Sequence, residues 1–164
     1  MEKYSKLIIK QVNKPYDSDG ALKNVLHYIS RKEECRYWRA FGASRKNIQE
    51  VVTQFLAIQG NAGKASRKRI RQVIISFPLY MDDVNVAKIV AEAISEYIFE
   101  EYQVVYAVHE KIGNLHIHFA INPVSYMTGK KWHMSSVEFM EWKKCVLEIV
   151  NGCLRSNGYR NCEL

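Results

Sequence analysis

The sequence predicts an α+β fold in which a central, largely antiparallel β-sheet is flanked by helices. Segments with the apolar pattern of strands alternate with segments that repeat apolar residues at helical spacing, in the order β α β α β α β β α. The last two strand-like segments are joined by a turn at Gly113-Asn114, which is typical of a β-hairpin and therefore of antiparallel pairing. We expect the helices to cover one face of this sheet.

The first half of the chain is expected to contribute two strands and two helices. Apolar residues recur at helical spacing from Leu22 to Ile29 and again from Ile48 to Ile58. The expected elements are a strand over 5–12, a helix capped by Ser18 or Asp19, a strand over 36–41, and a helix capped by Asn47, with Glu50 as its capping-box partner, that stops at Gly60.

The second half is expected to contribute the centre of the sheet. The stretch QVIISF is the most continuously apolar strand pattern in the chain, and Pro78 ends it. The expected elements are a strand over 72–77, a helix that starts at Asp82 or Asp83, strands over 103–109 and 115–122, and a last helix with Ser135 and Glu138 as its capping box.

Length and composition are those of one globular domain spanning residues 1–164, with 48% hydrophobic residues to build a core. There is no run of 18 apolar residues, and the first residues lack the apolar stretch of a signal peptide. We therefore expect no membrane insertion and a cytoplasmic location. The four cysteines form no CxxC pair and are expected to be reduced thiols.

The chain has an excess of positive charge, with 24 basic and 17 acidic residues and a net charge of +7. Such an excess favours polyanionic partners, above all nucleic acid, although a merely basic soluble domain is the alternative. Trp38, Trp132 and Tyr37 would then be able to stack on unpaired bases. The candidate phosphate-binding residues, for which a solvated surface position is the alternative, are Lys64, Arg67, Lys68, Arg69, Arg71, Lys130 and Lys131.

Three of the five histidines lie within ten positions of one another, in the predicted hairpin. Alternate residues of a strand share a face, so His116 and His118 point to one side and the apolar residues between them to the other. A turn at Gly113-Asn114 would place His109 directly opposite His118, on that same side. Three imidazoles would then converge without help from distant sequence.

Three neutral imidazoles on one face make a metal site with open coordination positions. Histidines that only form hydrogen bonds on an open sheet face are the alternative. Nitrogen ligands favour zinc, manganese or cobalt over magnesium.

These residues resemble a known motif. The stretch HEKIGNLHIHFAIN, continuing to HIHFAINPVSYMTGKKWHMS, resembles the metal motif of conjugative relaxases, the mobilization nucleases among the single-tyrosine HUH endonucleases. Upstream, ALKNVLHYISR resembles the family's tyrosine motif, and RQVIISFP resembles the strand between the two. The resemblance covers most of the chain and implies an antiparallel sheet flanked by helices.

The resemblance implies a DNA-binding nickase that cuts one strand at an origin of transfer and keeps the 5′ phosphate on a tyrosine. It implies Tyr28 as the catalytic nucleophile, although its helical position alone would suit a packing tyrosine. His109, His116 and His118 would hold a divalent metal ion, for which Mn²⁺ or Mg²⁺ is implied. Asn122 and Glu110 would support the site.

One position departs from the family pattern, which often has an acidic residue two positions after the first histidine. Here Lys111 stands there, and the neighbouring Glu110 faces away by strand parity. Which group polarises a histidine is therefore open. Tyr16 and Tyr126 are the rival nucleophiles, and Tyr126 would fit a rolling-circle replication initiator or a transposase with the same metal motif.

A non-catalytic DNA-binding module that keeps the metal site is the remaining alternative. The implied partners are single-stranded DNA at a transfer origin, together with accessory DNA-binding proteins and a coupling protein.

Overall fold

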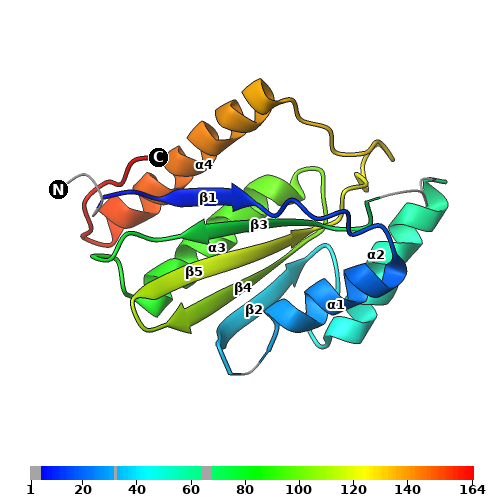
Figure 1. Cartoon of the computed structure of the whole chain (residues 1–164), viewed down its shortest axis with the longest axis horizontal. Coiled ribbons are helices and arrows are strands. Elements are labelled where there is room, and N and C mark those ends of the chain that lie inside the picture. The colour runs from blue at the N-terminus through cyan, green and yellow to red at the C-terminus, as the bar shows by residue number, and fades with distance from the viewer. Residues whose placement is uncertain (1–4, 32, 64–67) are drawn as a thin grey trace.

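A computed structural model describes residues 5–31, 33–63 and 68–164 of the chain. Its described part contains five strands and four helices, and Figure 1 shows how they are arranged. In chain order the elements are β1 (Ile8–Gln11), α1 (Asp19–Ile29), β2 (Cys35–Phe41), α2 (Ile48–Asn61), β3 (Arg71–Ser76), α3 (Val84–Phe99), β4 (Val104–Lys111), β5 (Asn114–Ile121) and α4 (Ser136–Ser156).

The five strands form one sheet in the order β1-β3-β5-β4-β2, and every neighbouring pair is antiparallel. Both the predicted α+β class and the predicted order of elements are confirmed. The hairpin β4–β5 occupies the centre of the sheet, where strand neighbours on both sides hold it in place. A site built on this hairpin is therefore supported by strand pairing on both sides.

The first strand is shorter than the predicted range of 5–12. The beginning of the predicted range pairs with the C-terminal segment instead of with β3. Lys6 forms a parallel bridge to Glu163, and the backbone N–H of Leu7 donates to the Glu163 carbonyl over 2.7 Å. The segment just before β1 and the last residues of the chain consequently lie side by side (Figure 1). Local sequence does not reveal this pairing, since the two segments are more than 150 residues apart.

Helices lie on both faces of the sheet, so the expectation that they would cover one face is wrong. On one face, α3 and α4 pack against large apolar side chains such as Tyr106, Ile117 and Phe119. On the other, α1 and α2 pack against Val105, Ala107 and Ala120. These small side chains lie next to the histidines on the same face, toward the start of β4 and the end of β5, and they let two helices cover part of a face that reads as polar in sequence.

The helix starts follow the predicted caps closely. Ser18 caps α1 and Asp83 caps α3, each through its side-chain oxygen. Ser135 and Glu138 form a complete capping box on α4. At α2 the box is incomplete, because Asn47 accepts from the N–H of Glu50 while the Glu50 carboxylate accepts from Ser44. That helix also continues past Gly60 to Asn61.

Within the described residues, no helix has both the length and the apolar character needed to cross a membrane. All four cysteines, Cys35, Cys145, Cys153 and Cys162, are free thiols, as expected from their spacing.

Candidate active site

The central hairpin brings the three clustered histidines together, but in a register that differs from the predicted one. Lys111 pairs with Asn114, so the turn consists of Ile112 and Gly113, and Gly113 takes φ +71°. His109 consequently lies opposite His116, and not opposite His118 as predicted. The difference is two positions along β5. Because side chains alternate with a period of two, all three histidines still share one face.

The three imidazole rings form a compact cluster. Their ring centroids are 4.3 Å apart for His109 and His118, 5.0 Å for His116 and His118, and 5.3 Å for His109 and His116. One nitrogen from each ring can be chosen so that all three atoms lie within 4.8 Å of one another. His109 and His118 are buried and His116 is half-buried, so the cluster is open on one side only.

Two of the histidines have one nitrogen held by a backbone carbonyl. Nε2 of His109 donates to the carbonyl of Ile29 at the end of α1, and Nδ1 of His116 donates to the carbonyl of Asn114 over 3.0 Å. A carbonyl can only accept, so each proton must be on the nitrogen that faces it. The other nitrogen of each ring, Nδ1 of His109 and Nε2 of His116, therefore keeps its lone pair.

The residues present fit a divalent metal ion, and a buried atom without a partner supports this. Nδ1 of His109 is buried and makes no hydrogen bond with any described residue. The nearest described carboxylate oxygen to it belongs to Glu34, 3.7 Å away, which is too far for a hydrogen bond. A buried nitrogen with an unused lone pair is costly in a protein interior, and a metal ion would satisfy it.

The electrostatic surroundings keep two of these rings neutral. Burial lowers the pKa of His118 to about 3, and repulsion by His109 and His116 adds to this effect. Burial also lowers the pKa of His109, with a further contribution from His116. Neutral imidazole is the form that binds metal ions. At neutral pH a metal ion would therefore bind these two rings without any net release of protons.

Tyr28 lies next to the cluster, in the last turn of α1. Its ring centroid is 6.2 Å from that of His118, in an edge-to-face arrangement. The residue is 46% exposed, so its hydroxyl is accessible, and the guanidinium carbon of Arg31 lies 5.1 Å from the centroid of its ring. The same helix end provides the Ile29 carbonyl, which accepts the hydrogen bond from His109. The phenol and the imidazoles are thus fixed relative to each other through α1.

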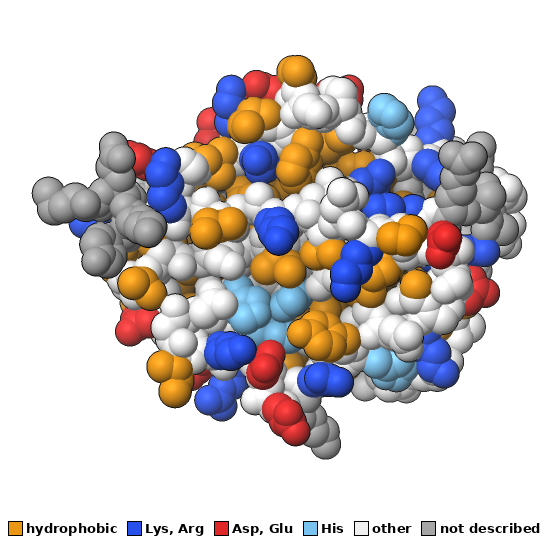
Figure 2. Space-filling view, viewed as in Figure 1, with side chains coloured by type: hydrophobic (Ala, Val, Ile, Leu, Met, Phe, Trp, Pro, Cys, Tyr) orange, Lys and Arg blue, Asp and Glu red, His pale blue; other side chains and the backbone are white. Residues whose placement is uncertain are grey.

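A cleft of about 570 Å³ begins at this tyrosine and runs between α1, β3 and the loop after β1. Its polar lining residues are Lys14, Tyr16, Asn24, Tyr28, Gln72 and His118. Figure 2 shows a histidine patch open near the middle of this face, bordered by hydrophobic, basic and acidic side chains. A cleft lined by a lysine, two tyrosines and one of the clustered histidines suits a nucleic-acid strand.

Several of these residues escape a reading of the sequence. Lys14 lies in no motif, and Asn24 and Arg31 stand within the tyrosine-motif stretch ALKNVLHYISR without being singled out there. Lys10 is a further basic residue on the histidine face. It pairs with Ile74, and Ile74 pairs with His118, so strand parity places Lys10 on that side of the sheet. That inference needs the order of strands, which the sequence alone does not supply.

The two rival tyrosines take different positions. Tyr16 lines the same cleft as Tyr28, and its hydroxyl donates to Gln72 over 3.0 Å. Tyr126 stacks on Phe99, with ring centroids 5.2 Å apart, and its hydroxyl donates to the Phe99 carbonyl. This places Tyr126 beside the beginning of β4, at the opposite end of that strand from His109.

The two residues expected to support the site are engaged elsewhere. Asn122 is fully buried and exchanges hydrogen bonds with Gln59, Gln103 and the Phe55 carbonyl, and within the described part of the chain it bonds to no histidine. Glu110 faces away from the histidines and pairs with Arg36 at 3.5 Å on the surface. Neither side chain reaches the cluster, and backbone carbonyls orient two of its histidines instead.

The predicted basic cluster lies away from the histidines. Lys64 and Arg67 are outside the described residues. Arg71 pairs with Ile121, at the far end of β5 from His116, and donates to the Trp132 carbonyl over 3.0 Å. Arg69 pairs with Asp19 at 3.5 Å.

Lys68, Lys130 and Lys131 lie in the same region as Arg71. Burial lowers the pKa of the Lys68 ammonium. Lys130 is exposed and Lys131 half-buried, in the segment that follows β5. These residues are 50 or more positions apart in the sequence from Lys10 and Lys14, and they form a second basic region at the other end of the hairpin.

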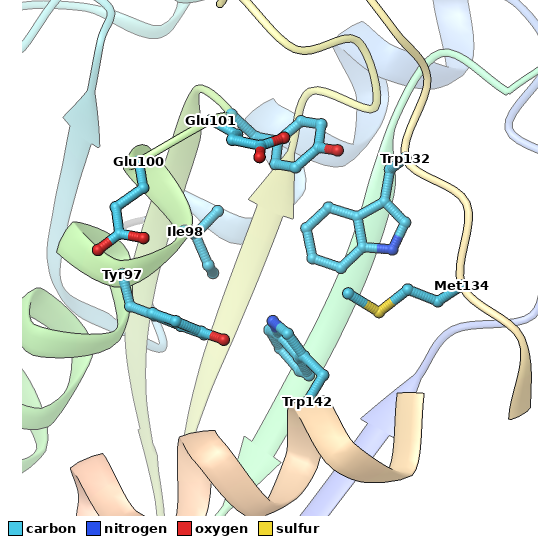
Figure 3. Close-up of a pocket in the computed structure, with 8 residues that line it drawn as sticks. Tyr97, Ile98, Glu100, Glu101, Trp132, Met134 and Trp142 are labelled. Carbon is cyan, nitrogen blue, oxygen red and sulfur yellow. The ribbon is translucent and has the colours of Figure 1, made fainter. Parts of the chain in front are cut away.

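Of the aromatic residues proposed to stack on bases, Trp132 is a core residue. It is 7% exposed and packs against Tyr102 and Trp142 on the α3 and α4 side of the sheet. Figure 3 shows it lining a cavity of about 260 Å³ with Tyr97 and Glu100. With carboxylates and no basic residue in its lining, this cavity does not suit a phosphate backbone.

Comparison with known proteins gives one family and one fold. Residues 28–151 match the family model described as relaxase, MobA/VirD2-like, nuclease domain. A solved structure described as the molecular basis of vancomycin resistance transfer in Staphylococcus aureus superposes with a TM-score of 0.63 at 16% identity, over 96% of each chain. No curated protein matches the sequence significantly.

Proposed function

This chain belongs to the MobA/VirD2-like relaxase nuclease family, and from that premise we propose that it nicks one DNA strand at a transfer origin through a covalent 5′-phosphotyrosine intermediate. Tyr28 is the proposed nucleophile, and His109, His116 and His118 are the proposed ligands of a divalent metal ion. The observation that carries the proposal is the juxtaposition of an exposed phenol with three clustered imidazoles, 6.2 Å between the rings of Tyr28 and His118.

The transfer step is a displacement at phosphorus. The hydroxyl oxygen of Tyr28 forms a bond to the phosphorus, the bond to the 3′ oxygen breaks, and the proton lost by the phenol is balanced by the one that the 3′ oxygen gains from solvent. Tyrosine suits a reversible step because its phosphodiester conserves the energy of the broken bond. When bound, a divalent ion would neutralise a non-bridging oxygen of the scissile phosphate and the developing charge on the leaving oxygen.

The residues of the cleft would hold the strand on either side of that phosphate. Arg31 places positive charge beside the Tyr28 ring and beside any phosphate that reaches its hydroxyl. Lys14 and Asn24 line the cleft further along, where they can bind backbone oxygens and base edges. Burial of His109 and His118 keeps water away from one side of the cluster, so that the strand enters from the side of His116.

The test is an adduct assay with single-stranded DNA from the transfer origin of the element that encodes the protein. With Mn²⁺, wild-type protein is expected to form a covalent species that survives denaturation. Tyr28→Phe should form none, since it removes only the attacking oxygen. Tyr126→Phe is the matched control, because it removes a phenol oxygen at the far end of β4 and should leave the adduct unchanged.

Three results would redirect the proposal. An adduct of equal yield on Tyr28→Phe would exclude Tyr28 as the nucleophile. Mapping of that adduct to Tyr126 would favour a replication initiator or a transposase. Binding of DNA without an adduct, across several metal ions and origin sequences, would favour a non-catalytic binding module.

We also propose the wider setting that the family implies. Single-stranded DNA at a transfer origin is the substrate, and accessory DNA-binding proteins and a coupling protein are the partners. The cytoplasm is the proposed location, as expected for an enzyme that acts on intracellular DNA.

A further inference from the structure

A buried glutamine connects a tyrosine of the cleft to one of the clustered histidines. The amide nitrogen of Gln72 lies 2.8 Å from Nδ1 of His118, and the hydroxyl of Tyr16 donates to the amide oxygen of Gln72 over 3.0 Å. Gln72 is 5% exposed and belongs to β3, where it pairs with Ala120 of β5. The three side chains form a continuous series of hydrogen bonds from the cleft to the cluster.

The chemistry of each group sets the direction of this series. An amide NH₂ group only donates, so Nδ1 of His118 must accept, and the proton of this neutral ring is then on Nε2. A nitrogen that carries a proton has no lone pair for a metal ion. In this orientation neither nitrogen of His118 is available as a ligand, since one faces Gln72 and the other is protonated.

The other two histidines are held by groups that cannot change direction. The carbonyls of Ile29 and Asn114 only accept, and they leave a lone pair on the remaining nitrogen of His109 and His116. A glutamine amide differs, because its NH₂ and oxygen ends have nearly the same shape. A half-turn about its last side-chain bond presents the oxygen where the NH₂ group was, without moving any neighbour.

We propose that Gln72 is a positioning residue whose amide turns over when a divalent metal ion binds to the cluster, which reverses the hydrogen bonds to His118 and Tyr16. The amide oxygen then accepts from Nδ1–H of His118, and the NH₂ group donates to the hydroxyl oxygen of Tyr16. The ring proton of His118 moves from Nε2 to Nδ1 by exchange with solvent, so no net charge changes. This inference rests on the metal site of the proposed function.

The backbone at Tyr16 supports a specific role for its hydroxyl. Among the described residues, Tyr16 is the one non-glycine residue with positive φ, at +43°. Residues other than glycine adopt this conformation rarely. Its carbonyl accepts from the backbone N–H of Arg69 over 2.7 Å, which holds the strained segment against the start of β3. This conformation aims the phenol at Gln72, where it can serve as donor or acceptor.

The direct test is the tautomer of His118, read by long-range ¹H–¹⁵N correlation on the full chain with and without Zn²⁺. Wild-type protein is expected to carry the His118 proton on Nε2 without Zn²⁺ and on Nδ1 with it. Gln72→Glu should show Nδ1–H in both conditions, because a carboxylate only accepts. The same His118 tautomer in wild type with and without Zn²⁺ would overturn the proposal.

Metal affinity provides a second readout, measured by calorimetric titration with Zn²⁺. Gln72→Met, which keeps the length but removes the amide, should weaken binding by about 10–100-fold, as loss of an outer partner typically does. Gln72→Glu should restore binding to that of the wild type or tighter. Tyr16→Phe should weaken binding less than Gln72→Met does. Gln11→Met is the matched control, since Gln11 lies on the neighbouring strand opposite Val73 and faces the other side of the sheet.

The outcomes separate this inference from the proposed function. If wild-type protein binds no Zn²⁺ at the three histidines, the proposed metal site itself is wrong. If Zn²⁺ binds there but Gln72→Met binds it as tightly as wild type, the metal site stands and only the role of Gln72 is wrong.

Discussion

At the scale of single residues, exposure divides the labour of the site. Tyr28 is 46% exposed, whereas His109 and His118 are 1% and 5% exposed. This difference suits the proposed roles, because a nucleophile must meet a substrate that arrives from solvent, while metal ligands are best kept neutral and fixed by their surroundings. The stability of the fold also depends on pH through these two buried histidines, because burial favours their neutral form more strongly than the unfolded chain does.

This dependence leads to a prediction about stability in acid. Burial lowers the pKa of His118 to about 3, while an unfolded histidine titrates near 6.5. The unfolded chain therefore takes up this proton first as the pH falls. The contribution of neutral His118 to stability is fully present above pH 6.5. It is lost between pH 6.5 and 3, by up to about 1.4 kcal/mol per pH unit. His109 adds to the loss in the same direction.

Urea unfolding of EDTA-treated protein at pH values from about 7 down to about 5 measures this loss. His118→Gln is expected to reduce the fall in unfolding free energy over that range. His27→Gln is the matched control, because it removes an exposed histidine outside the cluster. If the unfolding free energy of His118→Gln falls with pH as steeply as that of the wild type, the low pKa of His118 does not cause the loss of stability.

At the scale of elements, the end of α1 and the central hairpin define one rigid frame. The last turn of α1 carries Tyr28 and also supplies the Ile29 carbonyl that orients His109. The hairpin carries all three histidines, and strand neighbours hold it from both sides. At the other end of the hairpin, Asn122 connects the end of β5 to α2 through hydrogen bonds with Gln59 and the Phe55 carbonyl.

The position of Asn122 separates support of the fold from support of the site. Asn122→Ala would leave Gln59, Gln103 and the Phe55 carbonyl without their buried partner, so unfolding free energy should fall by about 3 kcal/mol. Metal affinity should remain within a few-fold of wild type. Urea unfolding and Zn²⁺ titration measure the two effects, with the exposed Asn61→Ala as control. Loss of Zn²⁺ binding without loss of stability would instead place Asn122 in the site.

Local chemistry made much of this frame predictable. Strand parity alone placed His109, His116 and His118 on one face, and it survived a two-residue error in the turn because side chains alternate. The caps at Ser18 and Ser135 depend only on the residues that follow them. Features that depend on distant pairing were not predictable. The pairing of Leu7 with Glu163 and the contact between Gln72 and His118 require the strand order to be known.

At the scale of the whole molecule, the two faces of the sheet have different tasks. The face under α3 and α4 is closed by a continuous apolar core. The other face is covered by α1 and α2 over the small residues, and a histidine patch with basic and acidic side chains around it opens beside them (Figure 2). A net charge of +7 favours nucleic acid as a partner of the molecule as a whole, and under the proposed function the open face is where the strand would bind.

This division predicts which lysines govern the salt dependence of DNA binding. Each phosphate that a basic side chain neutralises on a single strand contributes about −0.7 to the slope of log affinity against log salt. Lys14 lines the cleft beside Tyr28, so Lys14→Gln should reduce the magnitude of that slope by about 0.7. Lys144→Gln should leave it unchanged, since Lys144 lies on α4 and pairs with Glu141 at 3.0 Å.

Fluorescence anisotropy of a labelled single-stranded oligonucleotide at several salt concentrations measures the slope, in a Tyr28→Phe background that prevents cleavage. Lys130→Gln tests the second basic region in the same way, because Lys130 is exposed near the other end of the hairpin. A reduced slope for Lys130→Gln as well as for Lys14→Gln would mean that the strand runs the length of the hairpin. Equal effects of Lys14→Gln and Lys144→Gln would show instead that the open face does not direct the DNA.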